Sequence, residues 1–191
     1  NGSEADVRGE ESFRASWMNL EAQVVDCKNS FGSKFPSLSD YLSVLLFLSN
    51  FQVDEFHWTE LKESDVISKF EKIYERNLGS TDQAVTKSAS ENKRRLRELL
   101  TIAEKTLEAL QASARQSSQH GKQLQFSLMS LGGGLEAMYG FAPILAALFK
   151  SQRTETKELA KLAEAVEIAT FRLFKVGDMS ADAYKRLMLG Q

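Results

Sequence analysis

Proline is scarce in this chain, and apolar residues recur every three or four positions along most of its length. The 191 residues contain two prolines and 11 glycines. Proline interrupts helices and also marks the turns of all-β proteins, so its scarcity favours long helices with few corners. No segment alternates apolar and polar residues over the length of a strand. The sequence therefore predicts an all-α bundle of about six or seven helices with no sheet.

The helical spacing is clearest in the segments 10–31, 92–119 and 154–176. In each segment the apolar residues form one stripe along a predicted helix. Gly32 follows the first segment, at the position of a left-handed C-terminal cap. Ser37 can cap a helix that is apolar nearly all round, which is typical of a helix in the centre of a core. Shorter helices are predicted before Gly79 and after Pro143.

The domain organisation is predicted from the places where this spacing stops. Residues 1–9 are polar and are expected to form a tail in front of one helical domain, 10–191. The stretch 79–91 is rich in small and polar residues, so we predict a loop and an internal domain boundary there. A further break is expected at Gly121.

Charge and composition exclude several classes of protein. The formal net charge is -2, which provides no overall basic field for nucleic acid or an anionic membrane. No apolar run has the length of a membrane span. The single cysteine, Cys27, leaves no internal disulfide, and its place on an apolar stripe predicts a buried thiol instead of a reactive one. We expect a cytoplasmic protein without a membrane partner.

The sequence contains no recognisable catalytic or metal-binding motif. Neither His57 nor His120 has a histidine, cysteine or glutamate at the spacing that metal sites use. The glycines 132–134 are followed by Leu135 and Glu136 instead of the lysine and hydroxyl of a phosphate loop. We expect these glycines to bend the chain or to let helices approach closely. We predict no catalytic residue, no metal ligand and no cofactor.

One dense basic run, KRRLR, lies at the beginning of the predicted helix 92–119. Its cations are candidate contacts to DNA phosphates: Lys93, Arg94, Arg95 and Arg97. The alternative is a solvated helix face on which glutamates balance the cations. No aromatic residue interleaves with the run to stack on bases, which favours the alternative.

The last part of the chain resembles the helical region of the GmrSD-type restriction endonucleases, which are bacterial anti-phage proteins. The segments FAPILAALFKSQ and ELAKLAEAVEIATFRLFKVGDMSADAYKRL carry the resemblance, over about 45 residues. The matching positions are Pro143, Leu145, Ala147 and Leu148, then Phe171, Arg172, Leu173 and Phe174, then Ser180, Ala181, Asp182 and Ala183. In that family a ParB-like nucleotide-hydrolysing domain is joined through helices to an HNH-type nuclease domain.

The resemblance implies a non-catalytic helical domain that connects the two catalytic modules of a larger, nucleotide-dependent DNA endonuclease. The nucleotide-site motif of that family, similar to DGQQR, and its histidine-rich nuclease motif are both missing, so no catalytic role is transferred to any residue. The helix that begins after Ser180 has few turns, which leads us to expect a piece of a larger protein. The expected partners are other domains of that protein, and DNA. The alternative is a stand-alone helical adaptor that binds a partner protein through an apolar groove.

Overall fold

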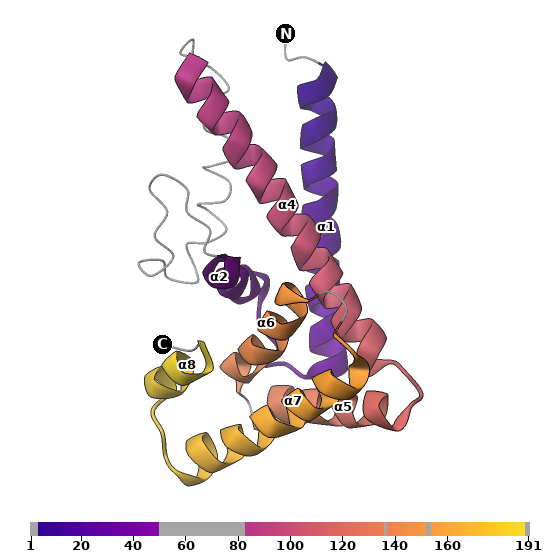
Figure 1. The fold of residues 1–191 in the computed structure, drawn as a ribbon, viewed down its shortest axis with the longest axis vertical. Coiled ribbons are helices and arrows are strands. Elements are labelled where there is room, and N and C mark those ends of the chain that lie inside the picture. Colours follow the sequence, from indigo (N-terminus) through magenta and orange to yellow (C-terminus); the bar gives the residue numbers. More distant parts are fainter. Residues whose placement is uncertain (1–3, 50–82, 136, 152–153, 190–191) are drawn as a thin grey trace. The chain divides into compact units, whose positions relative to one another are not determined.

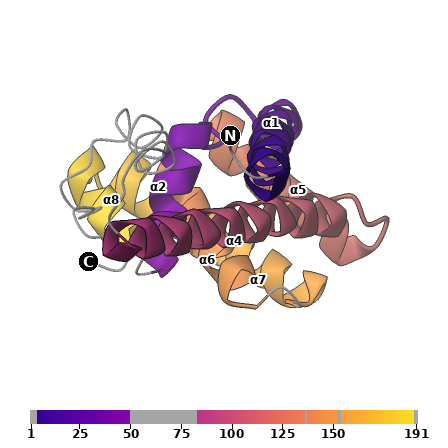
Figure 2. The ribbon, with the colours of Figure 1, turned by 90° about the horizontal axis from the view of Figure 1, so that it is seen from above.

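All regular structure in the computed structural model is helical, over the residues that it describes: 4–49, 83–135, 137–151 and 154–189. Figures 1 and 2 accordingly show only coiled ribbons in this part of the chain. Seven α-helices occur there: α1 Glu4–Phe31, α2 Leu38–Ser49, α4 Gln83–Ala114, α5 Gln119–Met129, α6 Ala142–Lys150, α7 Thr156–Thr170 and α8 Ala181–Leu189. The predicted all-α class is confirmed.

Three short helical segments of other types accompany the α-helices. Two are π-helices, η3 Ser130–Gly134 and η5 Phe171–Val176, which directly follow α5 and α7. The third is a 3-10 helix, η4 Met138–Phe141, in front of α6. The π-helices change the phase of the chain, so side chains beyond them leave the face that the preceding α-helix defines.

The chain divides into two compact units, and the first unit comprises Asn1–Leu20 and Leu38–Glu104. Within it the Tyr41 hydroxyl donates a hydrogen bond of 2.8 Å to the backbone oxygen of Ala103, which ties α2 to α4. The apolar helix α2 lies in a core, as predicted. The fully or almost fully buried leucines of this unit are Leu20, Leu42, Leu45, Leu46, Leu96, Leu99 and Leu100.

The second unit comprises Glu21–Ser37 and Lys105–Gln191. In it the ends of α1 and α4 accompany α5, α6, α7 and α8, and α7 lies along α5 and also contacts α6. Figure 1 shows α5 and α7 side by side in the lower part of the view. The large apolar side chains of this core include Leu107, Leu110, Leu124, Leu128, Leu131, Phe141, Leu145 and Leu159.

Two predicted helix starts are wrong. The helix α1 begins at Glu4, so most of the predicted tail is helical, and α4 begins at Gln83, so 83–91 is not a loop. Both stretches lack large apolar residues, but they contain Ala, Glu, Gln or Lys, which have good helix propensity. The units divide α4 between Glu104 and Lys105. The predicted helix before Gly79, the residue His57 and 79–82 of the predicted boundary lie outside the described residues.

Several predicted ends and starts are confirmed. Gly32 follows α1 with a φ of +111°, in the region that favours glycine, and Pro143 lies in the first turn of α6. The Ser180 hydroxyl accepts a hydrogen bond of 3.3 Å from the Ala183 amide at the beginning of α8. The break expected at Gly121 is misplaced, because α4 ends at Ala114 and Gly121 lies buried in the first turn of α5.

Candidate functional site

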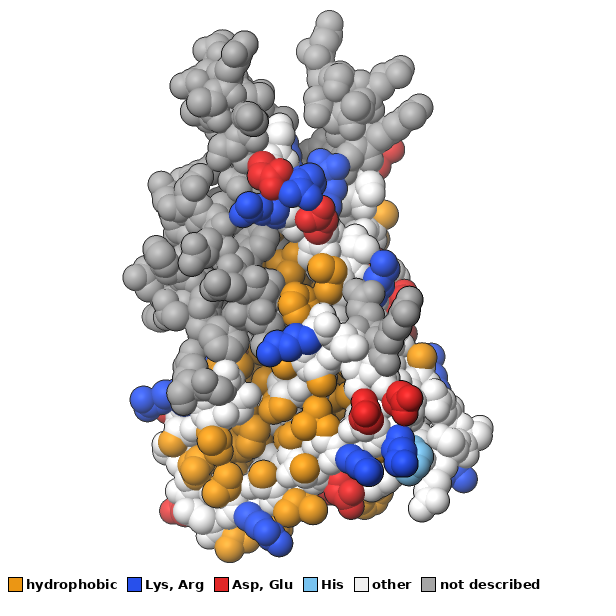
Figure 3. All heavy atoms as spheres, in the orientation of Figure 1, with side chains coloured by type: hydrophobic (Ala, Val, Ile, Leu, Met, Phe, Trp, Pro, Cys, Tyr) orange, Lys and Arg blue, Asp and Glu red, His pale blue; other side chains and the backbone are white. Residues whose placement is uncertain are grey.

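The basic run of α4 is largely paired with glutamates of the same helix. The Arg94 guanidinium donates two hydrogen bonds to the Glu91 carboxylate, at 2.9 and 2.6 Å, and it also contacts Glu98. Arg95 donates to the same Glu91 carboxylate at 3.1 Å. Figure 3 shows acidic and basic side chains next to one another on this part of the molecule. Two of the four candidate DNA contacts are therefore engaged inside the helix, as the alternative interpretation expects.

These ion pairs keep their charges over the whole physiological range of pH. The hydrogen bonds from Arg94 lower the pKa of Glu91 to about 2, and the carboxylate in turn raises the pKa of the Arg94 guanidinium. Arg97 differs from its neighbours, because its side chain is exposed and forms no ion pair with the described residues. It is the cation of this run that is free to meet a phosphate.

A second candidate lies where α5 and α7 run side by side in the same direction. Between the first half of α5 and the middle of α7, the Gln123 amide donates a hydrogen bond of 2.7 Å to the Glu164 carboxylate. Near their ends, Leu131 and Thr170 both lie against Gly140, where an added Cβ would be 2.9 Å from a Leu131 methyl carbon and 3.5 Å from the Thr170 oxygen. The two helices therefore run in the same direction and contact each other over part of their length.

Large apolar side chains stand exposed on the outer side of this pair. On α5 they are Phe126, 70% exposed, and Met129, 50% exposed. On α7 and its continuation they are Ile168, 45% exposed, and Phe171, 53% exposed. We call these four residues, with the cations described next, the α5–α7 face. Phe171 falls within the predicted helix 154–176 but does not belong to its buried stripe.

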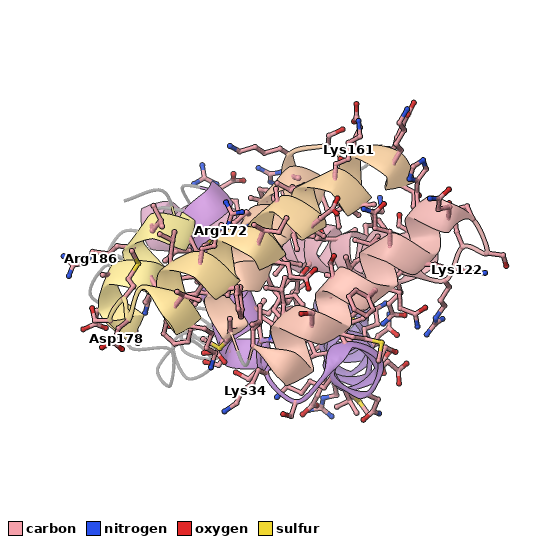
Figure 4. All side chains as sticks on the ribbon, turned by 90° about the horizontal axis from the view of Figure 1, so that it is seen from below. Lys34, Lys122, Lys161, Arg172, Asp178 and Arg186 are labelled. Atoms are coloured by element: carbon pink, nitrogen blue, oxygen red, sulfur yellow. The ribbon has the colours of Figure 1, made fainter. Side chains whose placement is uncertain are left out.

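Cations border these apolar side chains at both ends of the face. Lys122 and Lys161 lie near the beginnings of α5 and α7, whereas Arg172 and Lys175 lie in η5. Figure 4 views the molecule from below and labels Lys122 on α5, Lys161 on α7 and Arg172 beyond them. The Lys175 ammonium lies 5.2 Å from the centre of the Phe174 ring. The face thus has an apolar centre and basic ends.

Five residues of the segment that resembles the restriction endonucleases are exposed: Phe171, Arg172, Ser180, Ala181 and Asp182. No described residue accepts a hydrogen bond from the Arg172 guanidinium. A polar contact between the end of α7 and α8 uses other residues: the Thr170 and Tyr184 hydroxyls share a buried hydrogen bond of 2.7 Å. Burial raises the pKa of Tyr184.

Of the glycines 132–134, the first, Gly132, packs closely against the backbone at the end of α1. An added Cβ on Gly132 would lie 2.1 Å from the carbonyl oxygen of Phe31, and the Lys34 amide donates a hydrogen bond of 3.0 Å to the Gly132 oxygen. The expectation of a close approach is confirmed at this glycine. Around Gly133 no atom would lie within 4 Å of an added Cβ.

Cys27 is buried, as predicted. Burial raises the pKa of its thiol to about 11, although a hydrogen bond of 3.2 Å from the Gln111 amide to the sulfur acts in the opposite direction. His120 lies in the first turn of α5, and its buried Nδ1 has no hydrogen-bond partner among the described residues. In the same part of the chain, no three His, Cys, Asp or Glu side chains are grouped to hold a metal ion.

Among the described helices, none is both long and apolar enough to cross a membrane. The chain matches no protein-family model, no curated protein and no solved structure.

The α5–α7 face was not predicted from the sequence. A signal for it existed in Phe126 and Met129, which lie off the stripe formed by Leu124, Leu128 and Leu131.

Proposed function

We propose that this chain is a non-catalytic helical domain that acts by binding a protein, either a separate partner or another domain of a longer parent protein. The observation that supports this function is the exposure of Phe126, Met129, Ile168 and Phe171 on one face of the second unit. Exposed apolar groups that gather on one face lose contact with water when a partner covers them, which is typical of interaction sites. The domain would act in the cytoplasm, where Cys27 stays reduced.

Photo-crosslinking in the source cells tests this function. A photoreactive phenylalanine analogue replaces Phe126, and a control chain carries it at Val25, which is 50% exposed on α1. We expect one discrete adduct from position 126 and none from position 25. Mass spectrometry then identifies the crosslinked protein, and the purified pair must bind saturably. The function is contradicted when position 126 gives no adduct or the same products as position 25.

The exposed side chain of Arg97 favours a second function, in which the chain also contacts DNA. The chain would then be the helical region of a GmrSD-type modification-dependent restriction endonuclease in phage defence, connecting nucleotidase and nuclease modules. The resemblance of the C-terminal segment supports this proposal. The contact surface would be the basic run of α4, where Arg97 is free and Glu91 competes with phosphate for Arg94 and Arg95.

Two variants with opposite expected effects test the contact with DNA. Replacing Lys93, Arg94, Arg95 and Arg97 by glutamine should abolish salt-sensitive binding to a fluorescent DNA duplex. Glu91→Gln should strengthen the same binding, because it removes one carboxylate partner from Arg94 and one from Arg95. Fluorescence anisotropy at about 50 mM and 200 mM salt measures both effects. An affinity that neither variant changes would remove DNA from the proposal and leave the adaptor function.

A further inference from the structure

We infer that the α5–α7 face binds an acidic amphipathic helix of a partner protein. This inference rests on the proposed protein-binding function, and it adds the binding surface and the chemistry of the partner. Its basis is the combination of three observations: the register of two parallel helices, the apolar side chains that this register brings together, and the cations at both ends.

The register follows from the hydrogen bond between Gln123 and Glu164, 2.7 Å long. Phe126 lies three residues after Gln123, and Ile168 lies four residues after Glu164, so each is one helical turn further along. Because the helices are parallel, Phe126 and Ile168 lie level with each other across the seam. Another turn further on, Met129 and Phe171 extend the same apolar strip.

The cations of the face have few acidic neighbours. The side chains of Lys122, Lys161 and Arg172 form no ion pair with the residues that the structure describes. The carboxylate on the seam is that of Glu164, and it accepts a hydrogen bond from Gln123. The other acidic residue near the middle of the seam is Glu167, which is only partly exposed. Glu158 and Asp178 are also exposed near the two ends, so the charge there is mixed, and the cations Lys122, Lys161, Arg172 and Lys175 are in the majority.

Cations at both ends and apolar side chains between them, with Glu164 next to Lys161, indicate a linear ligand with acidic ends and an apolar middle. From Lys161 to Lys175 the face is about 20 Å long, which corresponds to a helix of about 14 residues. A helix that lies along the seam would place apolar residues at intervals of three and four against Phe126, Ile168 and Phe171. Its acidic ends would meet the cations, which steer the encounter and fix its direction.

Other occupants fit the same face less well. A nucleic-acid backbone carries a phosphate at every nucleotide and is matched by a continuous row of cations, whereas the centre of this face is apolar. A helical surface that lies on a membrane has its cations on a separate face from its apolar residues. Here Lys161 and Ile168 lie two turns apart on the same side of α7. A protein helix with acidic ends is therefore the occupant that the arrangement favours.

Selection from a displayed library of randomised helical peptides, with the purified chain as bait, tests the inference. We expect the enriched peptides to be acidic at their ends and amphipathic. The best one is then synthesised with a fluorophore and titrated by anisotropy against Phe126→Ala and Phe171→Ala. Each variant should weaken binding about fivefold or more, because large exposed aromatic side chains are frequent hot spots. Leu187→Ala, an equally exposed residue on α8, should leave it unchanged.

Several outcomes would overturn the inference while leaving the proposed function intact. Enriched peptides that are basic or uncharged would do so, and so would acidic peptides whose affinity neither Phe126→Ala nor Phe171→Ala changes. A Phe126-dependent dimer in light scattering would assign the face to a second copy of the chain. Phe126-dependent binding to vesicles with about 30% phosphatidylserine would assign it to a membrane surface. If neither the selection nor the crosslinking at position 126 finds a binder, the proposed function fails with the inference.

Discussion

At the scale of single residues, one backbone contact holds together parts of the second unit that are 100 residues apart. Gly32 and Gly132 meet so closely that a Cβ on Gly32 would lie 2.5 Å from the Gly132 carbonyl carbon. The Lys34 amide hydrogen bond to the Gly132 oxygen closes the same contact. Backbone atoms cannot move aside as flexible side chains do, so any added carbon must displace one of the two segments.

The variant Gly132→Ala should lower the free energy of unfolding by about 2 to 3 kcal/mol, because its methyl group collides with the Phe31 carbonyl oxygen. Gly133→Ala is the matched control, since nothing lies within 4 Å of its added carbon. It should change the free energy of unfolding by at most about 1 kcal/mol, and in the stabilising direction. Urea unfolding followed by circular dichroism measures both. Equal effects of the two variants would contradict the packing argument.

The thiol of Cys27 links stability to alkaline pH. Its pKa is raised from 9.0 to about 11 in the folded chain, mainly by burial. A raised pKa means that the neutral thiol is favoured by folding, so this stability is fully present below pH 9. It should be lost as pH rises from 9 to 11, by about 2 kcal/mol.

Unfolding free energies measured at pH 8 and pH 10.5, for the natural chain and for Cys27→Ala, isolate this effect from other groups that titrate in the same range. Tyr184 is one of them, because its pKa is also raised. We expect the loss of stability between the two pH values to be smaller in Cys27→Ala. The same loss in both chains would show that the thiol does not contribute.

At the scale of elements, the spacing of apolar residues predicts burial correctly only where a segment stays α-helical. It fails where a helix ends or changes its type. The stripes of α1 and α4 follow from spacing alone, because each element keeps α-helical geometry throughout. The same rule fails at Phe171, where α7 continues as the π-helix η5 and the phase changes. After η5 the left-handed backbone is found at Asp178, with a φ of +51°, and not at the preceding Gly177, whose φ is -82°.

The beginning of α5 depends on one cap that the sequence pattern did not single out. The Ser118 hydroxyl accepts a hydrogen bond of 3.1 Å from the Gly121 amide, and its backbone is extended as an N-cap requires. Ser118→Ala should cost about 1 kcal/mol of stability and speed hydrogen exchange of the Gly121 amide. Ser117→Ala is the control, since Ser117 is exposed and makes no hydrogen bond among the described residues. Unchanged exchange at Gly121 in Ser118→Ala would contradict the capping role.

At the scale of the whole molecule, bulk charge gives little information about binding, whereas the placement of charge gives much. The formal net charge of -2 would repel an acidic partner weakly. The sequence located one cluster of cations, KRRLR, because its members are adjacent in the chain. It did not locate Lys122, Lys161, Arg172 and Lys175 as a group, because only the pairing of α5 with α7 brings them to one face. The spacing of apolar residues predicts single helices, but it does not predict which helices that are distant in the sequence contact each other.

Two variants that lose the same amount of positive charge separate local from overall electrostatics. One replaces Lys122, Lys161, Arg172 and Lys175 by glutamine, and the other replaces Lys93, Arg94, Arg95 and Arg97. If the local field of the α5–α7 face steers an acidic helix, the first variant should slow association with the selected peptide about tenfold at low salt. The second should leave that rate nearly unchanged, because its cations lie on α4 and Arg94 and Arg95 are paired with Glu91. Stopped-flow fluorescence at about 20 mM and 200 mM salt measures both rates, and the difference between variants should shrink as salt screens the charges. Equal slowing in the two variants would mean that net charge, and not the face, governs the encounter.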